Sequence, residues 1–223
     1  MSPAHLALVV LGGGLVACGG QPTPGPQPQP AVPATRVTTD SSASTLVPAG
    51  FGTLKQEDIS IVLDPEGVRV AAIPLDESVI RLLAPDSYRS LRSLLETKRQ
   101  TIAQRAAMRG IREPRVWRVR FDGRAPDARF VPTDLTVTSG GREYRPVDVI
   151  GITPGFGEQR LQPRDSQTGL LMFEEGLDVS QPLIVTMGSE RNVDWDWNGN
   201  AGILRRLDTE RASIRARAAS RPH

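Results

Sequence analysis

Hydrophobic and polar positions alternate with a period of two in several short stretches of this chain. Residues 58–63 and 68–73 are rich in β-branched residues, and the Asp-Pro-Glu-Gly stretch between them is typical of a turn, so we expect a hairpin. A second hairpin is predicted at 135–138 and 143–147, where Ser-Gly-Gly-Arg supplies the turn. Further strands are predicted at 116–121, 169–174 and 183–187.

Other stretches follow the helical period of about 3.6 residues. Residues 86–109 carry an apolar stripe bordered by basic side chains, and Gly110 follows the last turn as a helix C-cap would. The stripe consists of Tyr88, Leu91, Leu94, Leu95, Ile102 and Ala106. A short helix is expected over 76–84, capped by Asp76 and ended by Pro85. A C-terminal helix is predicted from about residue 201 to residue 219.

Short strands joined by hairpins favour an antiparallel sandwich, because a parallel sheet needs a helix between most strands. Three features lie between 129 and 187: Phe-x-Pro-x-Asp-Leu from Phe130, Tyr-x-Pro from Tyr144, and Gly-Leu-Leu-Met-Phe from Gly169. This stretch resembles the immunoglobulin-like domains of bacterial surface lipoproteins. The resemblance implies a mainly β fold, an antiparallel immunoglobulin-like β-sandwich decorated by the long helix and the C-terminal helix. The cysteine pair and tryptophan spacing of antibody domains are missing from the sequence.

The beginning of the chain has a different pattern. A short apolar core at 6–16 is followed by Ala17 and by Cys18, the only cysteine in the sequence. The core is shorter than the roughly 20 residues that a membrane span requires. The arrangement resembles the lipobox of bacterial lipoprotein signal peptides, which implies that residues 1–17 are removed and that Cys18 is fatty-acylated. The alternative is an ordinary secretory signal in which Cys18 has no role.

The lipobox resemblance also implies where the protein acts. Acyl chains on Cys18 would anchor it to a membrane of the bacterial cell envelope, with the folded part outside the cytoplasm. Residues 18–50 are rich in Pro and Gln and then in Ser and Thr, a composition that favours an extended spacer, although a tail without a spacing role has the same composition. Residues 51–223 are then expected to form a single globular domain with a helical insertion at about 76–110.

Composition excludes several classes of function. The formal net charge of +2 is too small to indicate nucleic-acid binding. The only histidines are His5 and His223, so the expected domain offers no internal imidazole for a Ser-His or Cys-His relay and no His/Cys zinc site. A Gly-rich phosphate loop is also missing from the sequence. Glu174 and Glu175 are adjacent on a predicted strand, where neighbours point to opposite faces, so they form a poor acid–base pair. No catalytic residue is predicted.

One loop has the pattern of a ligand site. Asp194, Asp196 and Asn198, followed by Gly199, match the first half of an EF-hand-type calcium loop, in which oxygen ligands alternate and glycine is sixth. Arg205 occupies the twelfth position, where a bidentate Glu is needed. Calcium, the only candidate cofactor, would therefore require a carboxylate from elsewhere, such as Glu190 or Asp208. The alternative is a polar turn without metal.

The same loop contains Trp195 and Trp197, which either pack into the core or form a contact surface for a partner or glycan. Basic helical faces are the other candidate surface, because residues 86–109 hold six basic and two acidic side chains. Such a face could meet anionic lipid or envelope polymer, or could simply be solvated.

Two functional hypotheses follow. The first is a membrane-anchored envelope lipoprotein that acts as a non-enzymatic binding or assembly module for an envelope protein or glycan. The second is a carboxylate-dependent enzyme acting on envelope glycans, which would need two acidic residues at catalytic separation in one cleft.

Overall fold

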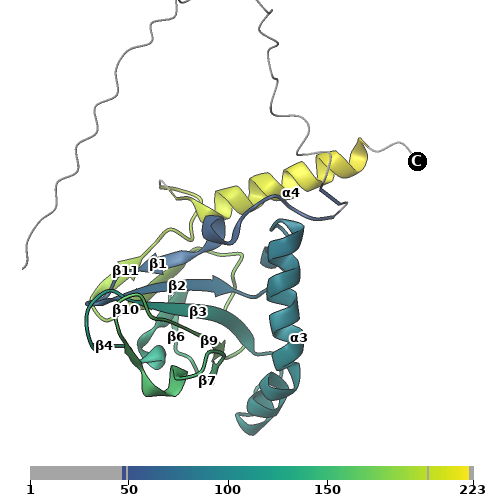
Figure 1. Ribbon diagram of the computed structural model, residues 1–223. Helices are drawn as coiled ribbons and strands as arrows, with labels where there is room; N and C mark the ends of the chain where they lie inside the picture. The colour runs from purple at the N-terminus through teal and green to yellow at the C-terminus, as the bar shows by residue number, and fades with distance from the viewer. Residues whose placement is uncertain (1–46, 49, 200, 221–223) are drawn as a thin grey trace, which may run out of the picture. The chain divides into compact units, whose positions relative to one another are not determined.

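Antiparallel strands form the sheets of this protein in a computed structural model that describes residues 47–48, 50–199 and 201–220 (Figure 1). The five-stranded sheet has the order β1 (Ile61–Leu63), β2 (Val68–Pro74), β3 (Arg115–Gly123), β9 (Ser166–Phe173) and β7 (Asp148–Gly151). The four-stranded sheet has the order β11 (Glu190–Asn192), β10 (Leu183–Met187), β5 (Thr136–Ser139) and β6 (Arg142–Tyr144). A small additional pair joins β4 (Ala128–Arg129) and β8 (Arg160–Leu161). The prediction of a mainly β fold with antiparallel sheets is confirmed.

The two long helices lie close to their predicted positions, whereas the short helix ends at Ile80 and not at Pro85 as expected. The helices are α2 (Glu77–Ile80), α3 (Pro85–Met108) and α4 (Ile203–Ala219), with 3-10 turns at η1 (Gln56–Ile59), η2 (Pro132–Asp134) and η3 (Phe156–Glu158). Asp76 caps α2 as expected, because its side chain accepts a hydrogen bond from the backbone N–H of Ser78. Pro85 stands at the first position of α3, where its missing N–H costs nothing. No described helix has both the length and the apolar composition that a bilayer span requires.

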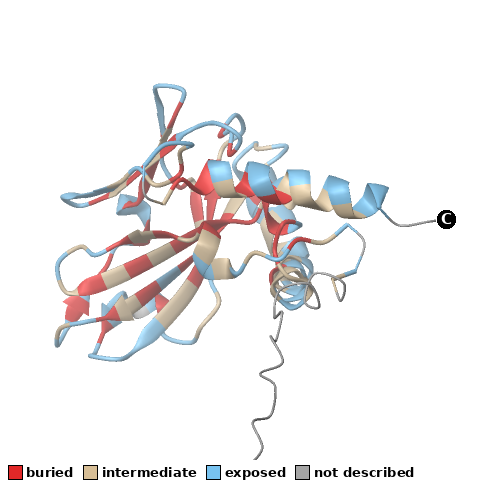
Figure 2. Cartoon of the chain, turned by 90° about the horizontal axis from the view of Figure 1, so that it is seen from above, coloured by how far each residue is buried: buried red, intermediate tan, exposed pale blue. Residues whose placement is uncertain are grey.

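The two larger sheets contribute to one hydrophobic core. Buried and half-buried residues alternate along the strands (Figure 2), as they do when one face of a sheet is covered. Val119 and Leu171 of the five-stranded sheet belong to the same buried cluster as Val137 and Val185 of the four-stranded sheet. The arrangement is sandwich-like. The predicted signal peptide, Cys18 and most of the linker lie outside the described residues.

Helix α3 runs beside the ends of β2 and β3 (Figure 1) and packs on the face of the five-stranded sheet that carries Val116 and Asp148. Asp148 at the start of β7 is paired with Met172 of β9 on that face. The carboxylate of Asp148 is buried and receives an ion pair from Arg105 at 3.1 Å and a longer one from Arg109 at 3.7 Å. This buried carboxylate therefore fixes the C-terminal half of α3 over the sheet.

Helix α4 is attached to the first described segment by a buried carboxylate. Glu210 accepts hydrogen bonds from the backbone N–H and the hydroxyl of Thr53, each at 3.0 Å. Arg217 pairs with Glu210 at 3.0 Å and also donates to the backbone carbonyl of Phe51. One side chain thus holds the two ends of the described domain together.

A tight aromatic contact at β9 gives a first prediction. A Cβ atom on Gly169 would lie 2.4 Å from Cζ of Phe156, whose ring packs against Phe121 and Phe130 and cannot easily move. We expect Gly169→Ala to lower the free energy of unfolding by about 1–3 kcal/mol. Urea denaturation measures the change. Gly157→Ala is the matched control, because no atom lies within 4 Å of its Cβ position; equal stability losses in both variants would contradict the packing argument.

A second prediction concerns Glu210. We expect Glu210→Gln to destabilise the protein by about 1–3 kcal/mol, because the Gln side chain has one acceptor oxygen in place of two and cannot neutralise Arg217. Thermal unfolding with circular dichroism provides the measurement. Glu190→Gln, at an exposed position on β11, should leave the melting temperature unchanged. An unchanged melting temperature in Glu210→Gln would show that this cluster contributes nothing to stability.

Candidate functional site

The loop that resembles half of a calcium site is organised by bonds within the protein. The side-chain amide of Asn192 donates to Asp194 at 2.8 Å and to the backbone carbonyl of Val62 on β1 at 3.0 Å. Asp196 accepts from the backbone N–H of Trp197. The carbonyls of Asp194 and Asp196 accept from the first amides of α4. The loop therefore caps α4 and joins the edges of the two sheets.

The remaining predicted ligands lie apart from this arrangement. Asn198 is exposed, and Glu190 lies exposed on β11. Asp208 accepts hydrogen bonds from the indole of Trp197 at 2.9 Å and from Arg211 at 2.7 Å. The bond from Trp197 is the main cause that lowers the pKa of Asp208 below its ordinary value. Among the residues that the structure describes, no three His, Cys, Asp or Glu side chains are grouped to hold a metal ion. Calcium binding stays a prediction.

The two tryptophans of this loop differ in exposure. Trp195 is fully buried, and its indole N–H donates to the backbone carbonyl of Val179 at 2.9 Å. Of the two alternatives for Trp195, the structure has the packed one, because the core covers the ring. Trp197 remains 39% exposed and can still contact a partner.

The adjacent glutamates support two neighbouring segments. Glu174 pairs with Arg142 at 2.6 Å. Glu175 accepts from the backbone N–H groups of Arg112 and Glu113, and these bonds lower its pKa. The two carboxylates thus have separate structural partners.

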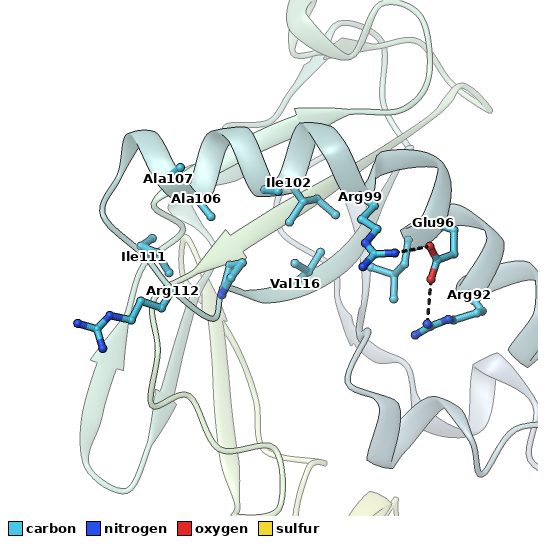
Figure 3. Close-up of a pocket in the computed structure, with 12 residues that line it drawn as sticks. Arg92, Glu96, Arg99, Ile102, Ala106, Ala107, Ile111, Arg112 and Val116 are labelled. Carbon is cyan, nitrogen blue, oxygen red and sulfur yellow. Dashed lines mark ion pairs between the residues drawn. The ribbon is translucent and has the colours of Figure 1, made fainter.

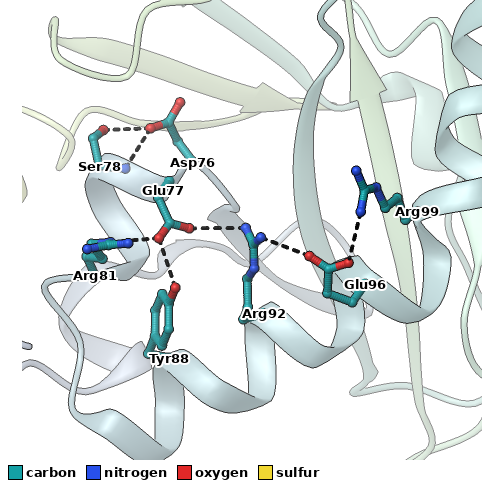
Figure 4. Close-up of polar contacts among 8 residues, drawn as sticks. All are labelled: Asp76, Glu77, Ser78, Arg81, Tyr88, Arg92, Glu96 and Arg99. Atoms are coloured by element: carbon teal, nitrogen blue, oxygen red, sulfur yellow. Dashed lines mark hydrogen bonds and ion pairs between the residues drawn. The ribbon is translucent and has the colours of Figure 1, made fainter.

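The basic face of α3 is largely neutralised by ion pairs (Figure 4). Arg92 lies between Glu96 at 2.8 Å and Glu77 of α2 at 3.4 Å, and Arg99 makes a longer contact of 3.7 Å with Glu96. Partial burial raises the pKa of Glu77, but hydrogen bonds from Arg81 and Tyr88 outweigh it and lower the pKa overall. The expected basic face is therefore a mixed network in which Arg99 is the most exposed cation.

A groove of about 580 Å³ lies beneath α3 (Figure 3). Its apolar lining comes from α3 and from the segment that leads into β3: Leu95, Ile102, Ala103, Ala106, Ala107, Ile111, Pro114 and Val116. Arg92, Glu96 and Arg99 lie at one end in this view, and Arg112 lies at the other. We call this feature the α3 groove. The apolar stripe of the helix predicted its upper wall, but only the fold brings Ile111 and Val116 beneath that stripe.

A smaller cleft of about 320 Å³ shares Leu95, Pro114 and Val116 with the α3 groove. Trp117 and Arg115 also line this cleft. The indole N–H of Trp117 and the Nε–H of Arg115 are buried and have no hydrogen-bond partner among the described residues. A buried donor without an acceptor costs about 1–3 kcal/mol, so these two groups destabilise the folded protein unless an acceptor reaches them.

A second hollow, of about 590 Å³, is lined by Glu66, Asp127 and Asp134 among other residues.

A catalytic acid at neutral pH needs a raised pKa. The described carboxyls for which a shift is resolved are Glu77, Glu175, Asp178 and Asp208, and the pKa is lowered in each. Their causes are hydrogen bonds and nearby arginines, which suit ion pairing and structural support.

Comparisons with protein-family models, with curated proteins and with solved structures each found no match for this chain.

The bonds of the 192–203 loop give a prediction. We expect Asp194→Ala to lower the melting temperature without calcium, by an amount equivalent to about 1 kcal/mol, because Asn192 then loses the carboxylate that orients it toward β1. Differential scanning calorimetry in EDTA measures this. Repeating the scan with calcium tests the metal separately: a rise in the parent that is lost in Asp194→Ala and Asp196→Ala would support a site, and no rise in the parent would remove that prediction.

Proposed function

We propose that this protein is a membrane-anchored envelope lipoprotein whose domain is a non-enzymatic binding or assembly module. The observation that carries the binding role is the α3 groove, an open apolar surface with charged groups at its ends. Binding sites commonly combine an apolar lining with a few polar groups that fix orientation. The anchoring role rests on the lipobox-like sequence ending at Cys18.

The immunoglobulin-like character of the sandwich is part of this proposal. It is supported by the antiparallel pairing within both larger sheets and by the β5–β6 hairpin next to β10. Tyr144 of the Tyr-x-Pro sequence is buried and donates its hydroxyl hydrogen bond to the backbone carbonyl of Gly176. The sequence feature thus has a packing role.

The lipid anchor has a direct test. In the native bacterium, Cys18→Ser should move the protein from the membrane fraction to the soluble extracytoplasmic fraction, because the modified thioether would be lost. Intact-mass measurement of the parent protein should show a chain that begins at Cys18 and carries acyl chains. An unmodified Cys18, or residues 1–17 still attached in the mature protein, would contradict the anchor.

The binding role is tested in cells by site-specific photo-crosslinking. A photoreactive amino acid at Ala103, an exposed residue that lines the α3 groove, should crosslink to one recurrent partner identified by mass spectrometry. The same amino acid at Lys98, on α3 but outside the groove lining, is the control. Equal crosslinking patterns from both positions would contradict a binding role for the groove.

A further inference from the structure

The α3 groove is incompletely covered by the protein itself. Leu95, Ile102 and Val116 are only partly buried, although they pack against the hydrophobic core. Ala103 and Ala107 are exposed and add little volume to the wall. Covering this surface would remove apolar area from water, which favours association by roughly 25 cal/mol for each Å².

The charges at the groove ends favour an acidic occupant. Arg99 is 80% exposed, and its one described carboxylate contact is Glu96, which Arg92 holds at shorter distance. The Arg112 guanidinium forms no ion pair among the described residues. Its neighbour Glu175 uses its carboxylate on backbone N–H groups, although the Arg112 charge also lowers the pKa of Glu175. A ligand with a carboxylate near each end would therefore meet a cation at each end.

The unpartnered donors favour a peptide over an alkyl chain. Trp117, which is only 1% exposed, and Arg115 line the cleft that shares Leu95, Pro114 and Val116 with the groove, and the Nε1–H of Trp117 and the Nε–H of Arg115 have no acceptor among the described residues. An extended peptide presents backbone carbonyls that accept such hydrogen bonds, whereas an acyl chain has none. From Arg99 to the end of α3 at Met108 the helix rises about 14 Å. An extended chain covers this distance with about four residues.

We propose that the α3 groove binds an extended peptide segment of a partner protein, in which acidic residues flank a short apolar stretch. This inference rests on the proposed binding function and specifies its partner. The occupant is not the linker of this chain, because Asp40 is the only acidic residue between 18 and 50. The apolar stretch would cover Ile102 and Val116, and the flanking carboxylates would pair with Arg99 and Arg112.

The probe is a fluorescein-labelled peptide, Gly-Glu-Val-Leu-Val-Leu-Glu-Gly, titrated against the full chain carrying Cys18→Ser. Fluorescence anisotropy should show saturable binding that weakens as salt rises, because the end contacts are exposed ion pairs. The same peptide with Lys in place of both Glu residues should bind at least about tenfold more weakly. In a nitrogen–proton NMR spectrum, the Trp117 indole resonance should shift while the buried, bonded Trp195 resonance stays in place.

Matched variants locate the site. Ala107→Trp fills the groove from an exposed helix position and should abolish binding without unfolding the protein. Arg99→Glu and Arg112→Glu should each weaken binding about tenfold or more. Lys98→Glu introduces the same charge change beside Arg99 but outside the lining, and should change affinity less than about twofold. Circular dichroism verifies that each variant is folded.

Several outcomes would overturn the inference. One is equal affinity for the Glu and Lys peptides, and another is peptide binding that survives Ala107→Trp. Palmitate binding that Ala107→Trp blocks, with no peptide binding, would make the groove a lipid site. Concentration-dependent self-association that Ala107→Trp abolishes would assign the groove to a second copy of the chain. Failure of every peptide together with a specific protein crosslink from Ala103 would reject this ligand chemistry and leave the binding function standing.

Discussion

The rest of the structure depends on how α3 packs on the face of the five-stranded sheet that carries Asp148. Met172 and Ile73 are buried on this face, together with the carboxylate of Asp148. Helix α3 packs on this face, and its position is set by the ion pairs of Arg105 and Arg109 with Asp148. A buried carboxylate must be paired, so the helix cannot shift along the sheet without leaving a charge uncompensated.

The α3 groove is a consequence of how α3 is held. Only Leu91 and Ala106 of this helix are fully buried. The other residues of its apolar stripe remain only partly buried: Tyr88, Leu94, Leu95 and Ile102. Alanine at positions 103 and 107 leaves space that larger side chains would fill. Three arginines of the helix are meanwhile paired within the protein, since Glu77 and Glu96 bind Arg92, and Asp148 binds Arg105 and Arg109. What remains open is the α3 groove, with Arg99 toward one end and Arg112 toward the other.

The two edges of the domain are joined by polar side chains. Asn192 bridges β11 and β1. Glu210 connects α4 directly to Thr53, and Arg217, which pairs with Glu210, binds the carbonyl of Phe51. The predicted linker would enter the domain beside Phe51. A pull on that linker would therefore act on a segment anchored by a buried carboxylate.

The sequence by itself determined the elements whose signal is local. The hairpins at 61–74 and 136–144, the Asp76 cap and the length of α3 follow from side-chain period and turn chemistry. It missed β7 and β11, short strands that exist because β9 and β10 lie beside them. The burial of Trp195 and the α3 groove were likewise decided by tertiary structure. The physical reason is that burial and cavity shape depend on which distant segments meet, and no local pattern records that Val116 lies beneath Ile102.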